Sequence, residues 1–302
     1  MKHIISCSAA AMAKVSPLED CVAALAGAGF DTIDFWLYRY SEGKDAPMLE
    51  PGWRDWVRRT RDSLAGAGLS VGQAHGLWNH GGPIRPDLSV DPSAEIFHRT
   101  IEAARMLGCR RLIFHPQFYG GRVDSEALRT RLLDINAEWF SALLPTAERF
   151  DVELHLENTF DFNHVQLPGD GGYQCTTAAE MVYLAQKLDH PLVKLCLDTG
   201  HANIAGQDIP AMIRAFGRHL GSLHLNDNYG RIGPIYEDLH LFPGYGRIDW
   251  DGVMEALRET DYAGTLNLEP TAELPRADAR TRVIQLRAAR EVLEAMAEAH
   301  DM

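Results

Sequence analysis

Six ionisable side chains share one kind of position, at or near the end of a short apolar segment. They are His75, His115, Glu157, Asp198, His224 and Glu269. Any one of them alone would be an ordinary polar residue next to solvent or a backbone group. If the last four met around one axis, they would desolvate one another, and their carboxylates would repel, unless a cation neutralised them. The pattern therefore predicts a divalent-metal site.

The donor types set the preferred metal. Three carboxylates and one imidazole favour Mn²⁺, with Mg²⁺, Co²⁺ and Zn²⁺ as alternatives. His201 follows Asp198 by three residues, so it is close enough to contact a bound molecule or a second metal. The alternative for His201 is a loop histidine packed on the start of a helix. Aromatic residues expected nearby, either for stacking on a ligand or for simple rim packing, are Trp36, Tyr38, Trp78, Phe118, Tyr119 and Phe160.

The elements that would position these residues alternate regularly along the chain. Strands are predicted at residues 3–8, 31–37, 69–75, 110–115, 151–157, 192–198, 222–226 and 265–269. Helical patterns lie near residues 17–28, 51–67, 92–108, 125–149, 176–189, 208–218, 249–260 and 277–299. The first strand resembles a secretory signal only loosely, because its apolar run is short and contains two serines.

Repeated strand–helix units of this number predict a (β/α)₈ barrel that forms a single domain over residues 1–302. No GxGxxG motif follows a strand, which argues against an open dinucleotide-binding sheet. Because such barrels carry their chemistry at the carboxyl ends of the strands, the six ionisable residues are expected to meet at one mouth.

Composition narrows the choice of partners. With 46% hydrophobic and 24% charged residues, the chain is ordinary globular material, and no apolar run is long enough to span a membrane. The net charge of −13 opposes a broad contact with a nucleic-acid backbone, so no nucleic-acid partner is expected. Five cysteines without a CxxC pair fit a reducing cytoplasm.

Several motifs then match a known family. HLENT, CLDTGHANIAG, HLND, DLHLFPGYGRIDW and NLEP, in this order, resemble the xylose isomerase-like barrel superfamily of sugar isomerases, ketose 3-epimerases and endonuclease IV. The resemblance implies that the four predicted ligands bind one metal, and that His201 and Arg231 hold substrate oxygens. Further substrate contacts are assigned to His75, His115, His240 and Trp36.

The resemblance has two qualifications. Ketose 3-epimerases usually carry a second glutamate soon after the ligand at Glu157, whereas this chain reads ENTFDFNHV and offers Asp161 or Asn163. The chain is also similar to endonuclease IV at further residues, which would be extra metal ligands. These are His75, His115, His201, Asp238 and His240.

We therefore predict a metal-dependent isomerase or epimerase that acts on a small carbohydrate through an enediolate. The catalytic residues would be Glu157 and Glu269, which would exchange a proton with the substrate carbon. The alternatives are an endonuclease IV-like phosphodiesterase, a metal-dependent lyase or dehydratase on a sugar-like substrate, and a non-catalytic binder. The resemblance also leaves room for a homo-oligomer that pairs through helical faces.

Overall fold

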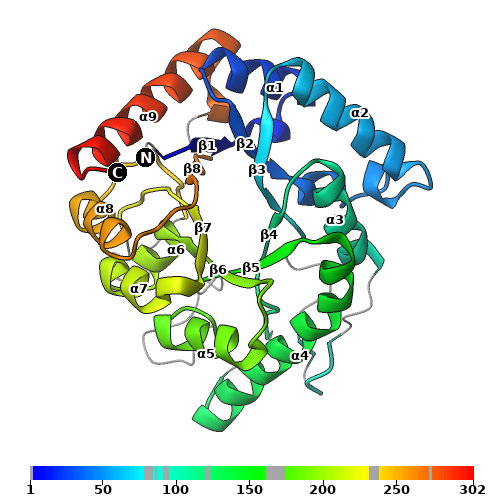
Figure 1. The fold of residues 1–302 in the computed structure, drawn as a ribbon, viewed down its shortest axis with the longest axis vertical. Helices are drawn as coiled ribbons and strands as arrows, with labels where there is room; N and C mark the ends of the chain where they lie inside the picture. Colours follow the sequence, from blue (N-terminus) through cyan, green and yellow to red (C-terminus); the bar gives the residue numbers. More distant parts are fainter. Residues whose placement is uncertain are drawn as a thin grey trace.

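The computed structural model of the chain describes residues 3–77, 84–85, 87–90, 95–119, 123–160, 174–230, 238–271 and 274–302. Within them, eight parallel strands form a ring (Figure 1). The strands are β1 (Ile5–Ser8), β2 (Thr32–Trp36), β3 (Ser70–His75), β4 (Arg111–Phe114), β5 (Glu153–Glu157), β6 (Val193–Asp198), β7 (Leu220–His224) and β8 (Leu266–Leu268). From β1 to β7 each strand pairs with the next one in the chain, and β1 also pairs with β8.

The ring closes between β7 and β8 just beyond the end of β7. Leu225 forms an isolated parallel bridge with Leu268. The amide of Leu225 donates to the carbonyl oxygen of Asn267 at 2.7 Å, and the amide of Glu269 donates to that of Leu225 at 3.1 Å. The predicted (β/α)₈ barrel is therefore confirmed.

Helices surround the ring on its outside (Figure 1). They are α1 (Leu18–Gly27), α2 (Trp53–Gly66), α3 (Glu95–Met106), α4 (Glu126–Phe150), α5 (Ala178–Leu188), α6 (Thr199–Ile204), α7 (Ile209–Phe216), α8 (Trp250–Glu259) and α9 (Ala279–Ala299). Short 3₁₀ turns are η1 (Met12–Lys14), η2 (Leu37–Tyr40), η3 (Pro47–Leu49), η4 (Gly217–His219) and η5 (Leu274–Arg276). In the described residues, no helix is both long enough and apolar enough to cross a bilayer.

One predicted strand is shifted, and one short helix was not predicted. The seventh strand begins at Leu220 and ends at His224, two residues before the predicted segment at each end. Beyond His224 the backbone turns to pair with β8 and then with Leu241, so it leaves the β6 ladder. The helix α6 was not predicted, because it is a short helix that begins directly at the end of β6.

The main apolar core lies between the strands and the helices. Phe97 of α3, Phe114 of β4 and Trp139 of α4 are almost fully buried. The Trp139 ring meets the Phe97 ring edge-on at 4.9 Å between centroids and the Phe114 ring at 6.3 Å. These contacts fix α3 and α4 against the barrel wall.

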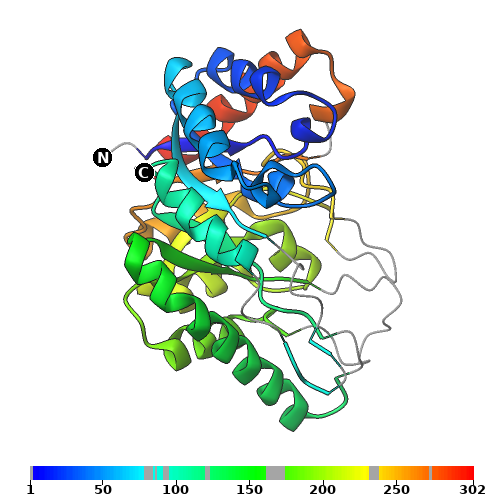
Figure 2. The same ribbon diagram turned by 90° about the vertical axis from the view of Figure 1, so that its right-hand side faces the viewer.

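The first described residues of the chain and its carboxyl end lie close together on one side of the barrel (Figure 2). His3 and Met302 line the same small cavity there. Because the parallel strands begin at this side, their carboxyl ends open on the opposite face.

Candidate active site

A cavity of about 680 Å³ opens at the carboxyl ends of the strands. Its lining includes His75, His115, Glu157, His201, Asp238, His240 and Glu269. Tyr38 and Arg39 of η2 and Lys14 of η1 also line it. A cavity of this size, lined by convergent titratable groups, is typical of a small-molecule site.

The four residues predicted to share a metal do come together. Glu157, Asp198 and His224 end β5, β6 and β7, and Glu269 directly follows β8. Each offers one ligand atom, and these four atoms lie within 4.8 Å of one another. All four side chains are buried, so their charges cannot be screened by bulk water.

The electrostatics of this cluster are strongly perturbed. His224 Nδ1 lies 2.8 Å from Glu157 Oε1 and 3.5 Å from Glu269 Oε2. Burial opposes the charged imidazolium, but the carboxylates of Glu269 and Glu157 raise the pKa of His224 well above its usual value. Burial raises the pKa of Asp198 to about 6, against the opposing effect of His201. Such a cluster favours an additional positive charge between its oxygens.

Asp198 holds its place through both carboxylate oxygens. Its Oδ1 accepts a hydrogen bond from the backbone amide of His201 at 2.7 Å and so caps α6. Its Oδ2 accepts from Asn226 Nδ2 at 2.8 Å. Because the helix begins at once, His201 is brought back over the end of the strand and into the cavity.

Asp34 of β2 is a site residue that the sequence analysis missed. Its buried Oδ2 accepts hydrogen bonds from His224 Nε2 at 3.1 Å and Asn267 Nδ2 at 3.1 Å, and from Gln73 Nε2 at 3.2 Å. When His224 is neutral and donates to Asp34, Nε2 carries the proton. The Nδ1 atom then has a free lone pair, and this lone pair faces Glu157. The signal in the sequence was an aspartate in the middle of the otherwise apolar β2.

Three histidines of the cavity share one orientation. In His75, His201 and His240, Nδ1 lies within hydrogen-bonding distance of a backbone carbonyl oxygen. The acceptors are Gly76, Asn158 and Glu269, at 2.9, 2.9 and 3.0 Å, respectively. Since a carbonyl oxygen can only accept, Nδ1 must carry the proton in each ring. The Nε2 atom is therefore the metal-binding or proton-accepting atom.

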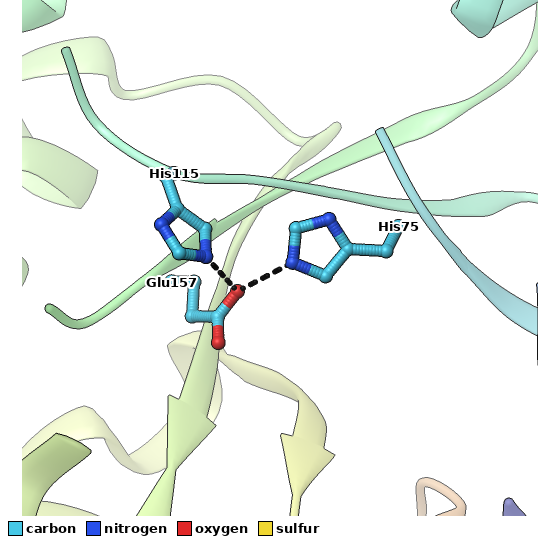
Figure 3. A group of neighbouring side chains, drawn as sticks. All are labelled: His75, His115 and Glu157. Atoms are coloured by element: carbon cyan, nitrogen blue, oxygen red, sulfur yellow. Dashed lines mark ion pairs between the residues drawn. The ribbon is translucent and has the colours of Figure 1, made fainter. Parts of the chain in front are cut away.

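Two histidines of the cavity, His75 and His115, point at the same carboxylate oxygen of Glu157 (Figure 3). His75 Nε2 lies 3.2 Å and His115 Nε2 lies 3.0 Å from Glu157 Oε2. Burial lowers the pKa of His115, although Glu157 opposes this effect. The three side chains offer ligand atoms within 4.8 Å of one another, so they could hold a second cation beside the first.

A third group lies around Asp238. Its Oδ2 is 2.9 Å from His240 Nε2 and 3.6 Å from His201 Nε2. Burial disfavours the charged ring of His201, but Asp198 and Asp238 raise its pKa to about 10. His201 and His240 also offer ligand atoms within 4.8 Å of one from Asp198. The structure thus places all five predicted extra ligands close to the four residues predicted to share the first metal.

The donor set fits divalent cations. In the described part of the chain, Glu157 Oε2 and Glu269 Oε2 are buried and receive no hydrogen bond of acceptable geometry, although imidazole nitrogens lie nearby. Either the facing imidazoles are protonated, or cations lie between them and the carboxylates. A cation would satisfy the carboxylate oxygens and the Nε2 lone pairs together.

Some residues that were predicted near the substrate are either buried in the core or outside the described residues. Trp36 was expected to bind substrate, but its side chain is fully buried and its ring stacks on Phe35 with 5.2 Å between centroids. The end of β2 points this ring into the core, and Tyr38, two residues later, lines the cavity instead. Arg231, Trp78, Asp161 and Asn163 lie outside the described residues.

The fold and the site together define the class of protein. It is a barrel in which carboxylates and imidazoles from the strand ends line one cavity. The chain belongs to the xylose isomerase-like TIM barrel family, whose model matches residues 22–297. Two curated relatives are D-psicose 3-epimerases. That of Agrobacterium fabrum is 26% identical over 268 residues, which is 85% of this chain and 80% of that enzyme.

The second D-psicose 3-epimerase, from Ruminiclostridium cellulolyticum, is 26% identical over 211 residues, which is 68% of this chain and 64% of that enzyme. The match therefore spans just under two thirds of the second enzyme's length. Among solved structures, the IOLI protein with a binding zinc atom superposes with a TM-score of 0.74 at 15% identity, over 98% of this chain and 99% of that one. At this identity the likeness concerns the fold.

Proposed function

We propose that the chain is a divalent-metal-dependent isomerase or epimerase of sugars or sugar derivatives. The observation that carries this proposal is the buried group of Glu157, Asp198, His224 and Glu269 at the floor of a cavity large enough for a small carbohydrate. The relatedness to D-psicose 3-epimerases supports the substrate class. The net charge of −13 argues against duplex DNA as the substrate.

The same four residues would hold the metal, with Mn²⁺ preferred for their oxygen-rich donor set. When bound, the cation would supply Lewis acidity that weakens the C–H bond next to a substrate carbonyl. His201 would contact a substrate oxygen through Nε2, because its Nδ1 is already engaged with the carbonyl oxygen of Asn158. The roles of His75, His115 and His240 as substrate contacts stay predictions, as does that of Arg231.

The proton transfer is assigned to the two glutamates. Glu157 ends β5, Glu269 directly follows β8, and both line the cavity, so they approach a bound molecule from two different strands. One carboxylate would remove the proton from the carbon next to the carbonyl, and the other would return a proton. Return to the opposite face of the same carbon gives an epimer, whereas return to the neighbouring carbon exchanges aldose and ketose. Burial of both carboxylates limits competition from water.

Replacing one glutamate separates proton transfer from metal binding. Glu269→Gln keeps an amide oxygen that can still bind the cation but cannot accept the proton. We expect turnover to fall by at least about 100-fold, while part of the metal is retained. The assays are metal content of the purified protein and solvent-deuterium incorporation into a panel of ketoses and aldoses. Glu50→Gln, at an exposed position, is the control and should keep both.

Full turnover by Glu269→Gln would show that this carboxylate is not the proton carrier. Absence of deuterium exchange by the wild-type protein in every substrate with a carbonyl would count against the enolisation chemistry itself. Metal content is informative in either case, because it tests the ligand set without requiring a substrate.

A second function is favoured by a separate observation, the assembly of the additional ligands around the primary group. Two further cations, one near His75 and His115 and one near Asp238, would suit a phosphodiesterase similar to endonuclease IV. Three tightly bound zinc ions in the purified protein, with incision of abasic-site DNA that Asp238→Ala abolishes, would support this alternative. One exchangeable cation without incision supports the isomerase or epimerase.

A further inference from the structure

Two cationic side chains, Lys14 and Arg39, line the cavity on elements that carry none of the four predicted metal ligands, and Glu42 lines it near them. Lys14 ends η1, which follows β1, and Arg39 lies in η2, which follows β2. The metal-binding group comes from β5 to β8. One cavity is thus lined by carboxylate and imidazole groups at the ends of β3 to β8, and by Lys14, Arg39 and Glu42 in the segments after β1 and β2.

No described residue forms an ion pair with either of these two cations. Within the same part of the chain, the buried Nε of Arg39 makes no hydrogen bond. The chain has 42 acidic and 29 basic residues, and elsewhere in the cavity Asp238 and Glu269 both lie close to the ring of His240. A buried guanidinium nitrogen without an acceptor costs stability unless a ligand supplies one.

The two groups are also close enough to influence each other. Burial and the neighbouring Arg39 both lower the pKa of Lys14. The Arg39 guanidinium lies 5.3 Å from the centre of the Tyr38 ring, and this ring limits the directions in which it can point. A guanidinium held in this way, with an ammonium beside it, suits an oxyanion that accepts two parallel hydrogen bonds.

We propose that Lys14 and Arg39 bind a carboxylate or phosphate group of the substrate, so that the natural substrate is an acidic sugar derivative and not a neutral ketose. This inference rests on the proposed function, because it places the reacting carbonyl of the same molecule at Glu157 and Glu269. The anionic group would fix one end of the substrate and leave the other end at the proton-transfer groups.

The first test compares substrates. The probes are D-psicose as the neutral ketose, a ketose 6-phosphate and a ketouronate, with solvent-deuterium incorporation as the assay. Wild-type protein is expected to show a higher kcat/KM for one of the acidic probes than for D-psicose. In Lys14→Gln/Arg39→Gln the ratio of acidic to neutral kcat/KM should fall by about 10- to 100-fold, mainly through KM, as for lost hydrogen bonds to a charged group.

The control for this variant is Lys44→Gln, which removes an exposed lysine close in sequence but outside the cavity lining. It should leave the ratio unchanged. The phosphate and carboxylate probes distinguish the two kinds of oxyanion. An unchanged ratio in Lys14→Gln/Arg39→Gln, or a preference of the wild-type protein for D-psicose, would overturn the proposal.

A binding measurement keeps the inference testable if no probe is turned over. Isothermal titration of the metal-free protein with the ketose 6-phosphate and the ketouronate should give about 10-fold weaker binding in Lys14→Gln/Arg39→Gln than in the wild type or in Lys44→Gln. Equal binding by all three proteins would refute the oxyanion subsite. Weaker binding without any turnover would support the subsite and count against the proposed function alone.

Discussion

Asp227, three residues after His224, is the most heavily used hydrogen-bond acceptor near the cavity. Its buried carboxylate accepts five hydrogen bonds of 2.9–3.2 Å, from the backbone amides of Asn228, Gly244, Arg247 and Ile248 and from the indole of Trp250. Its backbone also pairs with Leu241 in both directions, at 2.9 and 2.8 Å. Asp227 therefore holds the segment that follows His240 against the end of β7.

Asp227→Asn tests this role with little change in volume. An amide offers one acceptor oxygen, so its NH₂ group must face either the pair of donors at Oδ2 or the three at Oδ1. In the first orientation the buried indole of Trp250 and the part-buried amide of Gly244 lose their acceptor, and in the second the amides of Asn228, Arg247 and Ile248 lose theirs. At least one fully buried donor is left unsatisfied in either orientation, at about 1–3 kcal/mol, so the free energy of unfolding should fall by at least about 1–3 kcal/mol. Tm should drop by roughly 2–4 °C for each kcal/mol.

Urea unfolding followed by circular dichroism measures this loss through the midpoint at constant m-value. The control is Asp45→Asn, an exposed aspartate whose replacement should change stability by less than about 0.5 kcal/mol. If Asp227→Asn unfolds at the wild-type midpoint, its amide has found partners that this hydrogen-bond count excludes, and the reasoning fails.

Three further outcomes are expected. Asp34→Asn should weaken Mn²⁺ binding by about 10-fold in a titration calorimeter, because the amide orients the imidazole of His224 less strongly; unchanged affinity would remove Asp34 from this role. Chelation with EDTA should lower Tm, since a cation at 100 times its dissociation constant adds about 2.7 kcal/mol; identical Tm values with and without Mn²⁺ would contradict the metal site. Gly200→Ala should reduce both Tm and Mn²⁺ affinity, because its methyl group would overlap the Asn226 amide that holds Asp198; a wild-type affinity in this variant would argue against that coupling.

The barrel and the main cluster could be predicted because both depend on regular patterns. Apolar segments that end in an ionisable residue identify parallel strands and the mouth where they open, and this places Glu157 and Asp198 correctly. Asp34 could not be found in this way, because it lies inside an apolar strand and its role depends on His224, which is 190 positions away in the chain.

Other features depend on local geometry that spacing does not encode. The orientation of the His75 ring follows from one backbone carbonyl oxygen, that of Gly76. Trp36 and Tyr38 are both aromatic and two residues apart, yet the first points into the core and the second lines the cavity, because the strand ends between them. Lys14 and Arg39 drew no attention in the sequence, since unpaired cations are recognisable only once their surroundings are known.

The position of the two chain ends has a practical consequence. His3, the first described residue, and Met302 lie at the face where the parallel strands begin, and the cavity of the candidate active site opens at the face where the strands end. A fluorescent protein, an affinity tag or a surface tether attached close to His3 or Met302 would therefore be joined at the face opposite the cavity entrance. Immobilising the protein through its ends should present the cavities of all attached molecules outward, which suits a flow reactor or a sensor chip.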